Sequence, residues 1–275
     1  MSSVRVDAWA SGDAYEPYVG RWSRLAAREL LTWLAVPSGA EWLDVGCGTG
    51  ALAGTILDVA APGRVQAVDS STAYVRHARR HITDPRAAVF AADARALPQR
   101  SRSVDAVVSG LVLNFVPQPG AAAAEMARVA RADGVVAVYV WDYADGMQLM
   151  RYFWDAAAAL DARARELDEG HRFPLCHPDA LEALFRGAGL QGVESRALDV
   201  PTRFADFDDY WTPFLGGQGP APGYVAGLDG AQRAALRERL RAALPVARDG
   251  SIELVARAWA VRGHPAPSEA RRHHA

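Results

Sequence analysis

The chain has 275 residues, half of them apolar, and a formal net charge of −2. This near-neutral charge gives no global electrostatic case for binding nucleic acid or an acidic membrane surface. All 30 basic residues are arginine. P-loop nucleotidases, pyridoxal-phosphate enzymes and Schiff-base aldolases each need a lysine, so these classes are excluded in their usual forms.

The sequence also carries no sign of a membrane or secretory segment. No apolar run approaches the roughly 20 residues that a transmembrane helix needs. The N-terminus lacks the basic and then apolar order of a secretory signal. The two cysteines, Cys47 and Cys176, form neither a disulfide framework nor a zinc-binding pattern, and no metal site is predicted. We therefore expect a protein of the reducing cytoplasm that is not inserted in a membrane.

The first half of the chain alternates between stretches with helical periodicity and short apolar runs. Strands that are apolar almost throughout and that alternate with helices indicate a parallel sheet covered on both faces. Right-handed crossovers make such a sheet doubly wound. In chain order we expect helix 21–35, strand 40–45, helix 49–60, strand 64–69, helix 70–82 capped by Ser70 or Ser71, strand 87–93, strand 104–110, helix 120–131 and strand 134–143.

The regular alternation of apolar runs and helical stretches ends after Tyr143, where aromatic residues become frequent. The cluster of turn-forming residues at 216–223 predicts a loop, and the last twelve residues predict a frayed tail. Between these we expect helices at 147–168, 177–189, 204–217 and 231–244, and strands at 190–200 and 251–263.

The stretch EWLDVGCGTG, residues 41–50, ends an apolar strand with three alternating glycines. Strand, glycine turn and helix together are a general device for holding a nucleotide-like ligand at the carboxyl edge of a parallel sheet. Gly46, Gly48 and Ala51 satisfy a loose dinucleotide-binding pattern, and Asp69 lies about 20 residues on, where that pattern needs an acid. On these residues alone, an NAD(P)-dependent oxidoreductase stays possible.

Two further carboxylates favour a different ligand. Asp44 lies two residues before Gly46, where it would repel a pyrophosphate and suit a cationic group such as an amino-acid ammonium. Asp93 ends the third strand, where it suits the exocyclic amine of an adenine. One acid near an ammonium, one near a ribose and one near an adenine together outline S-adenosylmethionine. The competing interpretations are a helix cap for Asp69 and a loop acid for Asp93.

Five successive motifs resemble those of the class I S-adenosylmethionine-dependent methyltransferases. They are LDVGCGTG (43–50), VDSS (68–71), AADARALP (91–98), SVDAVVSGLVLNFV (103–116) and GVVAVYVWDY (134–143). The nearest resemblance is to the broad small-molecule branch that includes the ubiquinone and menaquinone C-methylases, and YEPYVGRWSR (15–24) resembles an N-terminal element of that branch. The resemblance is good over residues 15–143 and covers 144–263 only in general layout.

The resemblance implies S-adenosylmethionine as the cofactor and S-adenosylhomocysteine as its product. In this family Asp44 orients the methionyl amine, Asp69 binds both ribose hydroxyls, and Arg21 is a candidate partner for the cofactor's carboxylate. Ser70 flanks the adenine, and Asp93 with the Ala94 amide reads its edge. The full set of implied cofactor-binding residues is Arg21, Asp44, Gly46, Cys47, Gly48, Gly50, Asp69, Ser70, Asp93, Ala94, Ser109 and Leu111. We expect Cys47 to be a small filler between two glycines and not a nucleophile.

The acceptor is the less determined half of the prediction. Methyl transfer from a sulfonium to a small molecule is a direct displacement that depends mainly on alignment, so it needs no catalytic triad. His171, His177 and Tyr143 are candidate bases. Quinone-like, phenolic and natural-product compounds are candidate acceptors, and a non-catalytic cofactor-binding module is a further alternative. The predicted acceptor-site residues are Tyr15, Tyr18, Asn114, Phe115, Trp141, Trp154 and Trp211.

The predicted fold is an α/β fold with a seven-stranded, mostly parallel, doubly wound sheet of the Rossmann-like methyltransferase type. We expect five segments and leave the oligomeric state open between monomer and homodimer. The segments are an N-terminal helical lid (1–38), a cofactor-binding core (39–143), an inserted helical cap (144–189), C-terminal strands and helices that complete the sheet (190–263) and a flexible tail (264–275).

Overall fold

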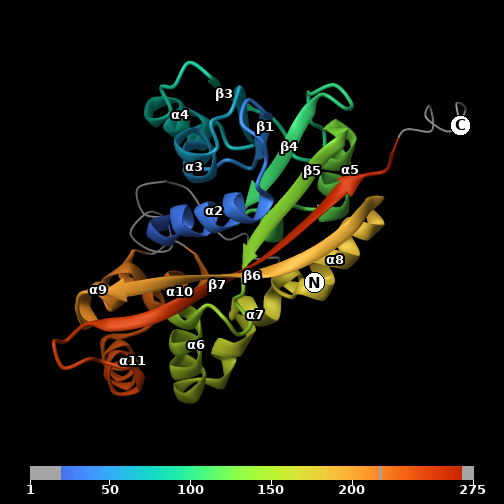
Figure 1. Ribbon diagram of the computed structural model, residues 1–275. Helices are drawn as coiled ribbons and strands as arrows, with labels where there is room; N and C mark the ends of the chain where they lie inside the picture. Colours follow the sequence, from blue (N-terminus) through green and yellow to red (C-terminus); the bar gives the residue numbers. More distant parts are fainter. Residues whose placement is uncertain (1–19, 217–218, 268–275) are drawn as a thin grey trace, which may run out of the picture. The chain divides into compact units, whose positions relative to one another are not determined.

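The computed structural model describes residues 20–216 and 219–267 (Figure 1). Its chain separates into two compact units, each built from several stretches. Among the described residues, unit 1 comprises 20–22, Trp141–Pro174 and Asp199–Arg257, and unit 2 comprises Ser23–Val140, Leu175–Leu198 and 258–267. Residues 144–174 of the predicted cap belong to unit 1 and residues 175–189 to unit 2, while the five-segment division stays a prediction.

A seven-stranded sheet with the order β3-β2-β1-β4-β5-β7-β6 confirms the predicted fold. Strands β1 to β5 pair in parallel, with Asp44 of β1 opposite Ala67 of β2. Strand β7 runs opposite to β5 (Figure 1). The strands are β1 (Glu41–Val45), β2 (Arg64–Asp69), β3 (Ala87–Ala91), β4 (Val104–Gly110), β5 (Ala130–Trp141), β6 (Leu190–Phe204) and β7 (Ile252–Pro265).

Helices cover the parallel strands of unit 2. Helix α3 contacts β2, α4 contacts β2 and β3, and α5 contacts both β4 and α8. The side chain of Ser71 accepts a hydrogen bond from the Tyr74 amide at 3.4 Å and caps α4, as one of the two predicted caps. The helices are α2 (Arg21–Leu34), α3 (Ala51–Val59), α4 (Thr72–His81), α5 (Pro119–Val129) and α8 (Pro178–Gly187), with short 3₁₀ helices η2 (Leu113–Phe115) and η4 (Pro174–Cys176).

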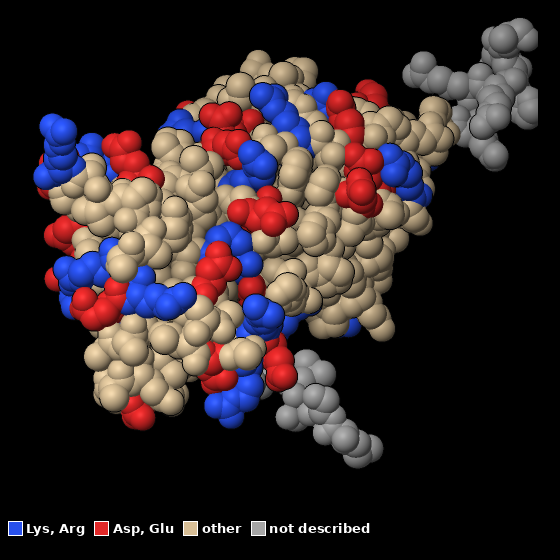
Figure 2. Space-filling view, turned by 90° about the horizontal axis from the view of Figure 1, so that it is seen from below, with Lys and Arg blue, Asp and Glu red and all other residues tan. Residues whose placement is uncertain are grey.

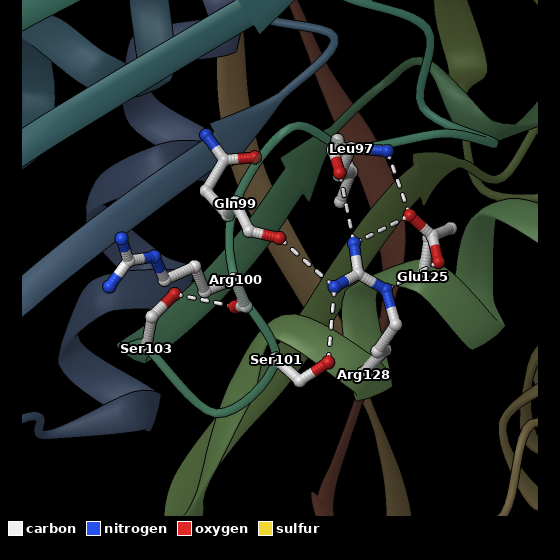
Figure 3. A network of polar contacts seen from close by, with 7 residues as sticks. All are labelled: Leu97, Gln99, Arg100, Ser101, Ser103, Glu125 and Arg128. Carbon is white, nitrogen blue, oxygen red and sulfur yellow. Dashed lines mark hydrogen bonds and ion pairs between the residues drawn. The ribbon is translucent and has the colours of Figure 1, made fainter.

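The loop between β3 and β4 is held on α5 by one arginine (Figure 3). The Arg128 guanidinium pairs with Glu125 at 2.6 Å and donates to the Leu97 and Gln99 carbonyl oxygens at 2.9 and 3.0 Å. It also reaches the Ser101 hydroxyl at 3.2 Å, while Glu125 accepts from the Leu97 amide at 2.8 Å. Because a guanidinium offers five donors in one plane, a single side chain satisfies several loop carbonyl groups.

Unit 1 has a core of aromatic side chains. Phe153 stacks on Phe214 with ring centroids 4.5 Å apart, and Tyr210 packs edge-on against Phe204 at 5.3 Å. The buried Tyr210 hydroxyl donates to the Leu149 carbonyl oxygen at 3.0 Å, so its polar end is satisfied. The elements are α6 (Gln148–Leu160), η3 (Ala162–Glu166), α7 (Glu169–Arg172), α9 (Phe207–Trp211), η5 (Thr212–Leu215), α10 (Pro220–Ala226) and α11 (Gly230–Ala243).

Three sequence-based expectations about this half of the chain are wrong. The predicted loop 216–223 contains the start of α10, because Pro220 at a first helical position suits the fixed φ of proline. The predicted helix 147–168 ends at Leu160, and the Asp161 side chain caps the next 3₁₀ turn by accepting from the Arg163 amide. The predicted tail begins too early, since β7 continues to Pro265.

A buried acid begins α7 in unit 1 and is hydrogen-bonded to α6. Glu169 is 3% exposed, and its carboxyl group accepts a hydrogen bond from the indole nitrogen of Trp154. Burial raises the pKa of Glu169 from 4.5 to about 8. The neighbouring Asp168 is also buried and pairs with Arg151.

We expect the stability of the folded chain to fall as the pH rises from about 5 to 8, and Glu169→Gln to weaken this dependence. Between an unfolded pKa near 4.5 and a folded pKa near 8, the folded state binds more protons, so raising the pH favours unfolding by up to about 1.4 kcal/mol per pH unit. Glutamine keeps an acceptor for Trp154 but does not ionise. Denaturant unfolding at several pH values measures the slope.

The exposed Glu166 offers a matched control, since Glu166→Gln removes a carboxylate three residues away that is not buried. The Glu166→Gln chain should keep the wild-type slope. An unchanged slope in Glu169→Gln would show that Glu169 is ionised in the folded protein at neutral pH.

Candidate functional site

The turn between β1 and α3 is built from three glycines in the left-handed region. Their φ angles are 76° at Gly46, 52° at Gly48 and 93° at Gly50. The amides of Gly46 and Cys47 both donate to the Val68 carbonyl oxygen, at 2.7 and 2.8 Å. The turn is thereby tied to the end of the neighbouring strand β2, at the carboxyl edge of the sheet.

The three glycines are needed for different reasons. A Cβ at Gly46 would lie 2.5 Å from the Val112 side chain, and one at Gly50 would lie 2.7 Å from Ile82. Within the part of the chain that the structure describes, a Cβ at Gly48 would meet no atom within 4 Å. The first and third glycines therefore allow close packing within the protein, and the middle one borders open space in which a ligand has room to approach the backbone.

Asp44, on β1, is a fully buried carboxylate with one unsatisfied oxygen. Its Oδ2 atom accepts from the Ala53 amide at 3.0 Å, whereas Oδ1 has no hydrogen-bond partner among the described residues. Burial, opposed by the Ala53 hydrogen bond, raises the pKa of Asp44 from 3.8 to about 7. A buried acceptor without a partner is costly, so a cationic donor such as an ammonium group fits this position.

Asp69, at the end of β2, is joined to the same turn. Its two oxygens accept from the Gly48 amide at 2.9 Å and from the Ser71 amide at 2.8 Å. Burial raises its pKa, and the two backbone hydrogen bonds oppose that shift. The alternative role of Asp69 as the cap of α4 does not fit, because the Ser71 side chain caps that helix. The carboxylate stays available to hydroxyl donors through its remaining lone pairs.

Asp93 is in a different environment. Its carboxylate forms a two-pronged pair with Arg95, at 3.0 and 2.7 Å, and its side chain is 44% exposed. This hydrogen-bonded pairing lowers the pKa of Asp93 to about 2. An adenine amine would have to share the carboxylate with Arg95. Ala94 is half-buried and Ser70 is exposed.

The last cofactor residues predicted from sequence lie at the carboxyl end of β4 and just after it. Ser109 is buried, and Leu111 has a φ of 62° and donates from its amide to the Tyr139 carbonyl oxygen at 2.8 Å. Burial, with Asp44 and Asp69 nearby, strongly raises the pKa of the Cys47 thiol. A neutral buried thiol is a poor nucleophile, which agrees with the predicted filler role.

Comparison with known proteins places this arrangement in a family. Residues 43–138 match a model described as a methyltransferase domain. The demethylmenaquinone methyltransferase of Roseiflexus castenholzii is 38% identical over 180 residues, which are 60% of this chain and 74% of that protein. The malonyl-(acyl-carrier protein) O-methyltransferase of Geobacter sulfurreducens is 30% identical over 66% of this chain and 67% of that protein.

The chain belongs to the class I S-adenosylmethionine-dependent methyltransferases. The solved YcgJ protein of Bacillus subtilis has the same fold, with a TM-score of 0.57 and 15% identity, covering 88% of this chain and 99% of its own. Several other curated relatives match over less than half of their own length. Family membership makes S-adenosylmethionine the cofactor.

Three features of unit 2 of this methyltransferase fit the cofactor. They are the unpartnered oxygen of the Asp44 carboxylate, the Asp69 carboxylate bonded to the Gly48 amide, and the open space beside Gly48. The structure brings Asp44, Gly46, Gly48 and Asp69 together, as the sequence predicts. Their individual contacts with the cofactor remain predictions.

The raised pKa of Asp44 predicts that cofactor affinity depends on pH. The free protein has a pKa near 7 at Asp44, whereas an ammonium ligand favours the ionised carboxylate. Cofactor affinity should therefore fall roughly tenfold as the pH drops from 8 to 6. Calorimetric titration measures it, and Asp44→Asn should bind weakly and with little pH dependence. Equal wild-type affinity at both pH values would contradict the ammonium assignment.

Arg21 is engaged elsewhere in the structure of this methyltransferase. Within unit 1 its guanidinium pairs with Asp209 at 2.8 and 3.1 Å and lies over the rings of Trp22 and Phe204, at 4.4 and 4.8 Å. Its predicted contact with the cofactor carboxylate would require it to leave or share this pairing, and remains a prediction.

The candidate bases are divided between the two units. His171 in unit 1 and His177 in unit 2 are both exposed. Tyr143 is buried in unit 1, with its ring 5.9 Å from that of Phe173. The positions of these three residues do not decide whether any of them is the catalytic base, and all three remain candidates.

Three of the seven predicted acceptor residues are core residues of unit 1. Trp141, Trp154 and Trp211 are all at least nine-tenths buried, and Trp154 donates to Glu169. Asn114 and Phe115 lie together on η2 in unit 2. Tyr15 and Tyr18 lie outside the described residues.

Three features have no counterpart in the sequence reasoning. Val112 packs against Gly46, Ser71 bonds to Asp69, and Cys176 contacts Asn114. The first and the third depend on residues that the fold brings together from distant parts of the sequence, and no local pattern predicts them, whereas Ser71 and Asp69 are only two residues apart. Over residues 20–216 and 219–267, no three histidine, cysteine or acidic side chains form a group that could hold a metal ion. Nor does any helix in those ranges have the length and apolar character needed to cross a bilayer.

Proposed function

We propose that this protein transfers the methyl group of S-adenosylmethionine to a small-molecule acceptor. The observation that carries the proposal is the unsatisfied Oδ1 atom of the buried Asp44, on the strand that leads into the glycine turn. A buried acceptor of this kind suits the ammonium of an amino-acid-bearing cofactor and would repel the pyrophosphate of a dinucleotide. This supports a methyltransferase over an NAD(P)-dependent oxidoreductase.

When bound, the sulfonium supplies a methyl group on an activated leaving group. In the displacement, a carbon–sulfur bond breaks as the bond from carbon to the acceptor atom forms, and the sulfur keeps the electron pair as a thioether. An oxygen or nitrogen nucleophile also gives its proton to water or to a protein base. The protein's task is to align the two reactants, for which Asp44, Asp69 and the glycine turn hold one of them.

The acceptor class is inferred from the relatives' names and from the charge on the surface. The relatives' names include demethylmenaquinone, malonyl-(acyl-carrier protein) and trans-aconitate, which are chemically dissimilar. On the face shown in Figure 2, arginine and acidic side chains are interspersed, with no broad area of one sign. We propose a small acceptor of the phenolic, quinone-like or natural-product type, handled in the cytoplasm.

A labelled-methyl screen tests the proposal. Purified protein and methyl-labelled S-adenosylmethionine are incubated with phenols, amines, reduced quinones and polyketide-like compounds, and the label is followed into product. Asp44→Asn serves as the low-binding control. Cofactor binding without any methylated product would favour a non-catalytic cofactor-binding module. A spectral change with NADH, without binding of S-adenosylmethionine, would overturn the proposal.

A further inference from the structure

One polar residue near the glycine turn is not among the predicted cofactor-binding residues. Leu111 and Val112 separate the end of β4 from the 3₁₀ helix η2, and Val112 packs against Gly46. Asn114, the only asparagine in the chain, lies on η2 and is partly buried. It therefore lies within unit 2, two residues from a side chain that touches the turn.

Of the two polar atoms of the Asn114 side-chain amide, the nitrogen has a hydrogen-bond partner in the described chain and the oxygen has none. Its Nδ2 atom donates to the sulfur of Cys176 at 3.8 Å, and Cys176 is fully buried in the core of unit 2. Its Oδ1 atom is buried and has no hydrogen-bond partner among the described residues. A rigid neighbour thus fixes one end of the amide while the carbonyl end is left unsatisfied, which is unfavourable unless a ligand completes it.

Gln99 also has an unsatisfied side-chain oxygen, but its position in the fold does not suit ligand binding. It too has a buried Oε1 without a partner in the described chain, and its Nε2 donates to Gln66 at 3.2 Å. But Gln99 lies in the loop that precedes β4, whereas Asn114 follows the carboxyl end of that strand, where parallel α/β sheets bind ligands. Asn114 is therefore the amide placed to meet an acceptor.

We propose that the side-chain carbonyl of Asn114 accepts a hydrogen bond from the methyl acceptor, donated by an O–H or N–H group other than the one that is methylated. This rests on the proposed methyl transfer and narrows its acceptor class to compounds with such a second donor. A site built to pair with a donor discriminates strongly against an analogue that lacks it, because the buried carbonyl is then left unpaired. Asn114 is thus a specificity-determining residue, and Cys176 positions it.

Stability tests the proposal without knowledge of the acceptor. Leucine has the same number of side-chain heavy atoms and the same branching as asparagine but no polar atoms, so removing an unsatisfied carbonyl in Asn114→Leu should leave the melting temperature equal to or above that of the wild type. If Oδ1 instead had a structural partner in the folded protein, such as a buried water, Asn114→Leu would melt several degrees lower. That result would overturn the proposal.

Matched acceptor pairs test the specificity directly. Catechol is compared with 2-methoxyphenol, and 2-aminophenol with 2-methoxyaniline, in the labelled-methyl assay with wild type and Asn114→Leu. In the wild type we expect at least a tenfold higher kcat/KM for the donor-rich member of one pair, and in Asn114→Leu a preference below about threefold. Gln99→Met is the control and should keep the wild-type preference.

The remaining outcomes each decide the matter. A preference that survives in Asn114→Leu, or equal turnover of both members by the wild type, overturns the proposal. So does a failure to methylate all four compounds by a protein that binds S-adenosylmethionine and methylates an acceptor without O–H or N–H groups. Failure of the proposed function itself is recognised separately, because the wild type then either gives no heat on titration with S-adenosylmethionine or binds it and methylates no compound at all in the labelled-methyl screen.

Discussion

Replacing Asp69 with alanine is expected to weaken binding of S-adenosylmethionine by roughly 100-fold or more. Two hydrogen bonds from ribose hydroxyls to a carboxylate are worth about 3 kcal/mol together at the low end, which corresponds to that factor. The loss should be larger still because Asp69 also accepts from the Gly48 amide at 2.9 Å and so holds the glycine turn. One substitution therefore removes both a ligand contact and a support of the binding backbone.

Calorimetric titration with S-adenosylmethionine and with S-adenosylhomocysteine measures this loss. The matched control is Asp105→Ala. Asp105 also accepts a backbone hydrogen bond, from the Glu41 amide at 2.7 Å, and pairs with Arg131, but it lies at the start of β4 and not at the carboxyl edge of the sheet. Asp105→Ala should lower stability and leave cofactor affinity within about twofold of the wild type.

The comparison separates binding from folding. If both variants lost affinity equally, destabilisation of unit 2 would explain the result and Asp69 would have no special role. If Asp69→Ala bound as tightly as the wild type, the ribose assignment would be wrong. Circular dichroism of each variant before titration confirms that the protein under test is folded.

The parallel strands could be predicted closely because their signal is local. Each is a short apolar run bounded by turn formers or helices, and β2 and β4 have the predicted limits of 64–69 and 104–110. Runs of this kind in alternation with helices admit few arrangements other than a doubly wound sheet. The glycine turn and Asp69 could be placed for the same reason, since each directly follows such a strand.

The partners of the site residues could not be predicted, because they are set by side-chain geometry. The third strand ends at Ala91 and not at Asp93 as predicted, and the Asp93 carboxylate pairs with Arg95, two residues on. Arg21 pairs with Asp209, 188 residues away. To predict either ion pair one would need to know the conformations of both partners, which periodicity and turn signals do not supply.

The less regular second half was harder to predict for a related reason. Gly and Pro between residues 216 and 223 are turn formers in isolation, but proline is also favoured at the first helical positions, and the two uses share one composition. The acceptor-site residues were the hardest to predict, because aromatic residues at helical spacing occur in a hydrophobic core as readily as in a ligand pocket. Trp154 and Trp211 are at least nine-tenths buried in unit 1.

Gly48→Val is expected to abolish cofactor binding at any practical concentration. A Cβ at Gly48 would project into open space, with no described atom within 4 Å, so the protein itself does not forbid the side chain. The branched side chain would instead occupy the space in which the cofactor approaches the backbone. Titration with S-adenosylmethionine at up to about 100 times the wild-type dissociation constant should give no heat, which corresponds to a loss of at least about 2.7 kcal/mol.

The backbone strain of this substitution needs its own control, and Gly39 provides one. Gly39 also has a positive φ, 82°, and open space around its Cβ position, but it precedes β1 and so lies at the opposite edge of the sheet. Valine in the left-handed region should cost each variant about 1–3 kcal/mol of stability. If Gly39→Val binds normally while Gly48→Val does not, the loss comes from the filled space. If both lose binding together, strain in unit 2 is the cause, and the open space beside Gly48 is not where the cofactor lies.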